Sequence, residues 1–232
     1  MKAPQLTRAI LAIAVAITVP NVARADEKPR DIDATCALTA CRQGGFEVML
    51  STDDKAHTYI GIPVSRSPYV LEDGAILIFP GETLAFKFNI DNGTLGKPEF
   101  IMAFAPQMPA RVDINGKLSD NPLDANLPPL PTKDGNVDMS ALPANSIILS
   151  YGEASEHKTG MMLSSDSTLT RAIKFEDTMY VVHPGKSGYT EFHTSTCPVR
   201  AGRGVFETWP HPIGPMILTN LRFVPDKETV CK

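Results

Sequence analysis

Short segments in which apolar and polar residues alternate, separated by Gly and Pro turns, run through most of this 232-residue chain. In residues 84–90, the apolar Leu84, Phe86, Phe88 and Ile90 alternate with smaller or polar residues. A period of two residues sends one set of side chains to a core and the other to solvent, which is typical of a half-buried β-strand. The pattern therefore favours an all-β chain.

Similar segments follow one another along the chain, so we expect roughly a dozen short strands. They are residues 46–51, 75–79, 84–91, 100–105, 112–114, 146–151, 160–163, 171–182, 189–194, 205–208 and 217–223. Apolar residues in 171–182 also fit one face of a helix, but the alternation fits better and predicts a strand. Residues 100–105 are apolar throughout, which predicts a strand covered on both faces.

Three turn sequences divide these segments. Pro80-Gly81-Glu82 predicts a hairpin between residues 75–79 and the strand that follows, and Asn92-Gly93 and Asn115-Gly116 predict tight turns. The fold class expected from this pattern is an antiparallel β-sandwich, immunoglobulin-like or jelly-roll-like and rich in loops.

Residues 117–145 interrupt the pattern, because they contain five of the 20 prolines. That density excludes a helix or a central strand and leaves a long loop or a linker between two domains. Strands of the same kind occur on both sides, so we expect one domain, residues 44–232, with a Pro-rich surface loop. Residues 26–43 precede it as an N-terminal lead-in, charged and mobile at least as far as residue 35.

The first 25 residues have the three parts of a secretory signal peptide. Lys2 and Arg8 are positively charged, residues 9–19 form an eleven-residue apolar run, and Ala23-Arg24-Ala25 is a small-x-small cleavage site. Cleavage after Ala25 predicts a periplasmic or secreted protein, and no later apolar run is long enough for a membrane helix. Removing Lys2, Arg8 and Arg24 changes the formal net charge from −4 to −7. A nucleic-acid partner is therefore not expected.

Export changes how the four cysteines are interpreted, because an oxidising compartment favours disulfides. The close spacing of Cys36 and Cys41 predicts one bond, and Cys197 pairs most economically with Cys231. A zinc site is the alternative, but no C-x-x-C spacing supports it.

Motifs of the common enzyme classes are missing from the sequence: G-x-S-x-G, H-E-x-x-H and G-x-G-x-x-G do not occur. We therefore expect a non-catalytic protein with a binding or envelope-support role, no cofactor, and an envelope protein or a glycan as partner. The alternative is a metal-dependent or other hydrolytic enzyme that uses His183, His193 and His211.

Trp209, the single tryptophan, lies in a Pro-rich segment that could hold its ring rigidly as a stacking platform. On that interpretation Trp209, Tyr189 and His211 contact a ligand. The competing interpretation, which we favour, is that Trp209 is buried against the last strand and His211 lies near the surface.

Overall fold

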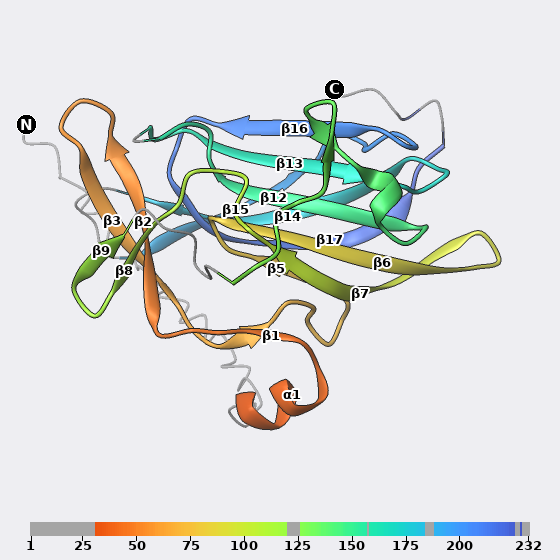
Figure 1. Cartoon of the computed structure of the whole chain (residues 1–232), viewed down its shortest axis with the longest axis horizontal. Helices are drawn as coiled ribbons and strands as arrows, with labels where there is room; N and C mark the ends of the chain where they lie inside the picture. The colour runs from red at the N-terminus through yellow and green to blue at the C-terminus, as the bar shows by residue number, and fades with distance from the viewer. Residues whose placement is uncertain (1–30, 120–125, 157, 184–187, 226–227, 229–232) are drawn as a thin grey trace, which may run out of the picture. The chain divides into compact units, whose positions relative to one another are not determined.

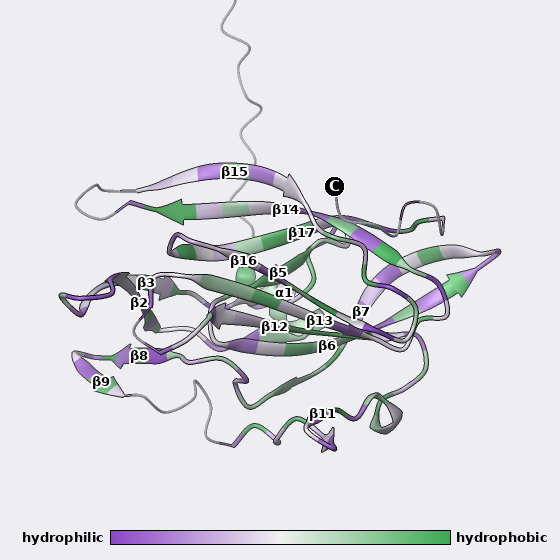
Figure 2. Cartoon of the chain, turned by 90° about the horizontal axis from the view of Figure 1, so that it is seen from above, coloured by the Kyte–Doolittle hydropathy of each residue, from purple (hydrophilic) through white to green (hydrophobic). Residues whose placement is uncertain are grey.

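Two antiparallel sheets, packed face to face, form the centre of the protein (Figures 1 and 2). The structure is a computed structural model, and it describes residues 31–119, 126–156, 158–183, 188–225 and 228. The five-stranded sheet has the order β16 (Gly204–Trp209), β13 (Met161–Ser167), β12 (Ser146–Glu153), β6 (Glu82–Asp91) and β7 (Thr94–Phe104). The four-stranded sheet has the order β15 (Tyr189–Ser195), β14 (Ile173–Val182), β17 (Ile213–Phe223) and β5 (Ile76–Ile78).

A third sheet lies at one end of this sandwich, at the left in Figure 1. Its order is β3 (Thr58–Val64), β2 (Phe46–Asp53), β8 (Arg111–Ile114) and β9 (Lys117–Ser119). The remaining elements are short: the helix α1 (Ile32–Leu38), the pair β1 (Cys41–Arg42) and β4 (Ser67–Pro68), the pair β10 (Thr132–Lys133) and β11 (Asn136–Val137), and the 3₁₀ helix η1 (Met139–Ala141). The expected all-β, antiparallel class is confirmed.

One hydrophobic core fills the space between the two main sheets, and the third sheet adds side chains such as Leu50 and Ile62 to it. Tyr151 of β12 crosses this core, and its hydroxyl donates to the carbonyls of Ile213 (2.9 Å) and Gly214 (3.0 Å) in β17. These bonds satisfy the phenol in an otherwise apolar interior. They also place β12 opposite β17.

The Pro-rich segment is more structured than a surface loop. Residues 126–142 pass along the outer face of the five-stranded sheet, where Leu130 is 7% exposed and packs with Ile148 and Phe104 in a second hydrophobic cluster. The hairpin β10–β11 and η1 lie in the same segment, below the sheet in Figure 2. Residues 120–125 lie outside the described part. The division into domains stays a prediction.

The prediction of a hairpin across Pro80-Gly81-Glu82 is wrong. β5 pairs with β17 and β6 pairs with β12 and β7, so this turn carries the chain from one sheet to the other. Gly81 has a φ of +85°, and its N–H donates to the carbonyl of Tyr151 (2.7 Å). The turn residues predicted the reversal of direction correctly, but not which strands would pair afterwards.

The two Asn-Gly turns are confirmed. Asn92 and Gly93 (φ 48° and 76°) join β6 to β7, and Asn115 and Gly116 (φ 56° and 80°) join β8 to β9. Positive φ at both positions is the requirement of a type I′ turn, which suits the twist of a two-residue hairpin.

The N-terminal lead-in also differs from the expectation, because residues 32–38 form α1 rather than a mobile segment. The Cys36–Cys41 disulfide and an ion pair between Asp33 and Arg66 help to hold this short helix. The disulfide is local and was predicted, but Arg66 is 33 residues from Asp33, so the local sequence does not show this second contact.

Of the two predicted disulfides, the described residues show one, Cys36–Cys41. Cys231 lies outside the described residues, so the Cys197–Cys231 bond stays a prediction. The signal peptide and its cleavage site also lie outside them. In the part of the chain that the structure describes, no helix is long and apolar enough to cross a membrane.

Candidate functional site

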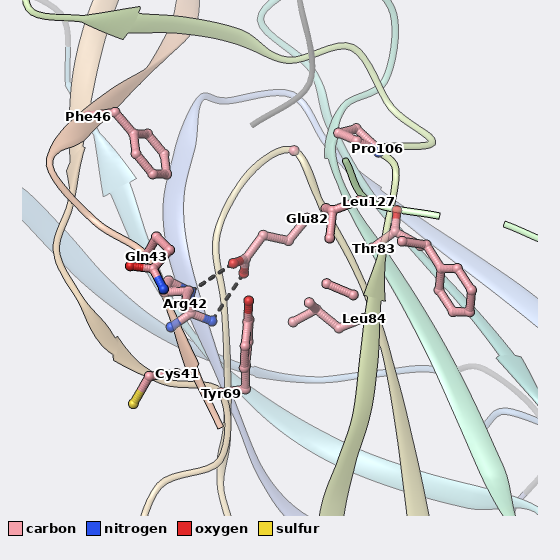
Figure 3. A pocket seen from close by; sticks show the side chains of 13 residues that line it. Cys41, Arg42, Gln43, Phe46, Tyr69, Glu82, Thr83, Leu84, Pro106 and Leu127 are labelled. Carbon is pink, nitrogen blue, oxygen red and sulfur yellow. Dashed lines mark hydrogen bonds and ion pairs between the residues drawn. The ribbon is translucent and has the colours of Figure 1, made fainter. Parts of the chain in front are cut away.

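A cavity of about 260 Å³ lies where the short β1–β4 pair meets the five-stranded sheet (Figure 3). We call it the Arg42 cavity. Its walls come from several elements and are more apolar than polar, with polar side chains in five of the thirteen lining residues. It is lined by Cys41, Arg42, Gln43, Phe46, Tyr69, Gly81, Glu82, Thr83, Leu84, Ala103, Phe104, Pro106 and Leu127.

Local structure on both sides fixes Arg42 in this wall. Cys41 is tied to α1 by its disulfide, and β1 pairs with β4 through Cys41 opposite Pro68 and Arg42 opposite Ser67. Arg42 is only 3% exposed. A buried guanidinium needs an opposite charge and a full set of hydrogen-bond acceptors.

The structure provides Arg42 with both an opposite charge and enough hydrogen-bond acceptors. Arg42 Nε donates to Glu82 Oε1 (2.7 Å) and Nη2 to Glu82 Oε2 (3.1 Å), which is the bidentate arrangement that suits a carboxylate. Arg42 Nη1 donates to Ser67 Oγ (2.9 Å) and the carbonyl of Pro68 (3.2 Å), and Nη2 also donates to the carbonyl of Leu77 (2.6 Å). These bonds match the five N–H donors of a guanidinium. Arg42 therefore has no donor left for a ligand.

Aromatic rings complete the surroundings of the Arg42 guanidinium. The guanidinium carbon lies 4.6 Å from the ring centre of Tyr69 and 4.9 Å from that of Phe79, both within cation–π range. Tyr69 in turn stacks on Phe100 of β7, with ring centres 4.1 Å apart. In Figure 3, Arg42 and Glu82 face each other beside Tyr69, while Leu84 lies on the other side of Tyr69 from Arg42. The charges in this wall are neutralised within the protein.

A second unusual group lies inside the sandwich. Asp177 of β14 is 1% exposed, and neither carboxyl oxygen has a hydrogen-bond partner among the described residues. Burial, reinforced by the negative charge of Glu207 in β16, raises the pKa of Asp177 to about 8. At neutral pH this carboxyl is therefore mostly protonated, the form that burial favours.

Glu207 of β16 is the acid whose negative charge adds to the shift of the Asp177 pKa. Partial burial raises the pKa of Glu207, while the backbone N–H of Cys197, which donates to its Oε1 (2.5 Å), and the charge of Lys174 act in the other direction. The bond from Cys197 places β16 opposite the chain that continues from β15. Asp177 has no access to solvent, so we assign it no contact with a ligand.

The residues expected to form a ligand platform are only partly brought together. Tyr189 is opposite Val182 in the β14–β15 pair, and Val182 N–H donates to the carbonyl of Pro212, so Tyr189 and His211 lie at the same end of this sheet. Tyr189 is 46% exposed and meets Tyr180 edge to face. Trp209 lies in the other sheet, where it pairs with Met161 of β13 and packs, half-buried, against the main core. His211 is exposed.

The three histidines of the metal hypothesis do not form a cluster. His183 follows the last residue of β14, whereas His193 is opposite Thr178, five residues earlier in that strand and about 17 Å away at the rise of a β-strand. His183 hydrogen-bonds Thr190 (2.8 Å), and His193 hydrogen-bonds Thr178 (3.0 Å) and Glu191 (2.9 Å). Within the described residues, no three His, Cys, Asp or Glu side chains lie close enough to hold a metal ion.

Sequence reasoning missed Arg42, Glu82 and Asp177. The sequence did contain a signal for Asp177, because it occupies an inward position between Phe175 and Met179 of an alternating strand. No comparable signal marks Arg42 and Glu82, which are 40 residues apart and meet only in the folded chain.

Fold and site together define a class: an antiparallel β-sandwich protein with an apolar cavity beside a neutralised, buried ion pair. Comparison with protein-family models and with curated proteins finds no match for the chain.

Proposed function

We propose that this is a non-catalytic binding protein of the cell envelope, and that the Arg42 cavity holds an uncharged, largely apolar group of its ligand. The observation that carries the proposal is the complete pairing of Arg42. Since its donors are all used within the protein, the cavity offers no free cation to an anionic ligand. The apolar surface of Phe46, Leu84 and Phe104 is therefore available to an uncharged group.

The size of the cavity limits the range of ligands further. A dry protein cavity of about 150 Å³ binds benzene, and the Arg42 cavity measures about 260 Å³. It therefore suits a group larger than one aromatic ring, such as a short acyl chain or a large apolar side chain of an envelope protein. Gln43, which is exposed at the cavity, is the polar side chain placed to orient such a ligand.

Filling the cavity tests the proposal. Ala103 of β7 lines it and lies opposite Leu84 in the β6–β7 pair. An uncharged fluorescent probe, N-phenyl-1-naphthylamine, should bind the native protein saturably, and Ala103→Trp should reduce its affinity at least tenfold. Ala201→Trp, at an exposed turn, is the matched control and should bind like the native protein.

Either of two results would contradict the proposal. If the native protein gives no saturable signal, or if Ala103→Trp binds the probe as well as Ala201→Trp does, the cavity is not the binding site. Equal unfolding midpoints in urea for the two variants ensure that the comparison reports binding rather than folding.

The proposal includes the compartment. The signal sequence supports export with cleavage after Ala25, and N-terminal sequencing of protein recovered from the periplasm or medium should begin at Asp26. A chain that begins at Met1 in the cytoplasm would contradict this. We also keep the second disulfide, Cys197–Cys231, and a fold of immunoglobulin-like or jelly-roll-like type as parts of the proposal.

A further inference from the structure

The strand β15 forms an open edge of the four-stranded sheet. Among the described strands it pairs only with β14, and six of its seven residues are exposed. An edge of this kind presents unpaired backbone groups that can pair with another chain. Phe192, at the middle of the strand, is 47% exposed.

The opposite sheet covers the inner face of β15 only in part. Tyr151 places β12 opposite β17, and Glu207 of β16 accepts a hydrogen bond from the backbone N–H of Cys197, just beyond the end of β15 (2.5 Å). β16 is the last strand of its sheet among the described residues, and Phe192, in the middle of β15, remains 47% exposed. Phe192 points to this inner side, because it is the register partner of the buried Met179.

The hydrogen-bond pattern shows which backbone groups are available. Thr196 N–H donates to the carbonyl of Phe175 in β14 (3.1 Å). Residues alternate along an antiparallel ladder, so Thr194, Phe192 and Thr190 also direct their backbone groups toward β14. The N–H and C=O groups of the other four residues point to the open edge. These four are Tyr189, Glu191, His193 and Ser195.

Charge favours one register for pairing with a second copy. In a two-fold antiparallel pair centred on Phe192, Glu191 of each copy lies opposite His193 of the other, and all four outward-facing residues have partners. Moving the centre by one residue puts either Glu191 opposite Glu191 or His193 opposite His193. Like charges directly opposite each other destabilise a strand pair, which disfavours Glu191 opposite Glu191, whereas Glu191 opposite His193 puts a hydrogen-bonding imidazole beside the carboxylate.

We propose that the protein forms a two-fold dimer through β15, in which the four-stranded sheets of two copies join into one continuous sheet. Phe192 lies on the two-fold axis and packs against Phe192 of the second copy. Such a pair is of the non-hydrogen-bonded kind, which brings the two Cα atoms to about 4.5 Å and favours aromatic contact. The interface is the same surface on both copies, as in most symmetric dimers.

Cysteine cross-linking tests the register directly. A Cα separation of about 4.5 Å is within the range of disulfides, so Phe192→Cys in the full chain should form a disulfide-linked dimer on mild oxidation. Phe206→Cys is the matched control, because Phe206 is 70% exposed on the edge strand of the other sheet. Equal cross-linking of the two variants, or none in Phe192→Cys, would overturn the proposal.

Light scattering on a sizing column tests the association without new cysteines. The native chain should change from the mass of one chain to that of two as its concentration rises. Glu191→Lys should weaken the dimer at least tenfold, and Glu191→Lys combined with His193→Glu should restore it. A native chain that stays monomeric at every soluble concentration overturns the proposal, even if β15 pairs with another protein.

Discussion

Asp177 shows how one residue can work against the stability of its own strand. In the unfolded chain its carboxyl titrates near the ordinary value, whereas burial raises the pKa of Asp177 to about 8 in the folded protein. Between these values the folded state holds a proton that the unfolded state has lost. The contribution of Asp177 to the free energy of unfolding is therefore fully present below about pH 4. It is lost progressively as the pH rises to about 8.

The matching prediction concerns Asp177→Asn, which keeps the shape of the side chain and removes its charge. Native protein should lose unfolding free energy between pH 5 and pH 8, with a limit of about 1.4 kcal/mol per pH unit. The variant should lose much less and be the more stable of the two at pH 9. Urea unfolding across this range measures both, and parallel curves would show that Asp177 is not the titrating group.

At the scale of elements, the turns decide how strands meet. Asn92 and Gly93 both have positive φ, which an L-residue with a Cβ adopts only at a cost. A Cβ at Gly93 would still have room, since the nearest atom is 3.7 Å away in Arg171. Backbone conformation alone therefore requires glycine there.

We predict that Gly93→Ala lowers the free energy of unfolding by about 1 kcal/mol. Gly160→Ala is the matched control, because its nearest atom is also at an ordinary distance of 3.6 Å and its φ is not in the left-handed region. Urea unfolding compares the two variants. Equal losses would mean that strain at the β6–β7 turn is not the cause.

At the scale of the whole molecule, the disulfides constrain very different lengths of chain. Cys36 and Cys41 are five residues apart and stabilise a local feature, α1 with β1. The predicted Cys197–Cys231 bond closes about 35 residues, worth roughly 4 kcal/mol in the chain-entropy account, against nearer 2 kcal/mol for the shorter loop.

We therefore predict that Cys231→Ser lowers the melting temperature clearly more than Cys41→Ser does. Calorimetry measures the difference, and peptide mapping without reduction should recover Cys197 linked to Cys231. Peptides that join Cys36 or Cys41 to either late cysteine would refute this connectivity.

The sequence by itself determined the class of fold and most of its strands. Alternation in residues such as 84–90 and 217–223 depends only on the period of a β-strand, and the two Asn-Gly turns depend only on local backbone preference. Both are local properties, so they can be read without knowing which strands are neighbours. The Cys36–Cys41 bond belongs with them, because its two ends are close along the chain.

Only the tertiary structure decided which strands pair and what meets between them. The reversal at Gly81 joins two sheets rather than two strands of one sheet, and no local signal separates these outcomes. Arg42 and Glu82 meet across 40 residues, and Tyr151 reaches the carbonyls of Ile213 and Gly214 across the sandwich. The Arg42 cavity exists because these distant segments pack together, so its chemistry is a property of the fold and not of any motif.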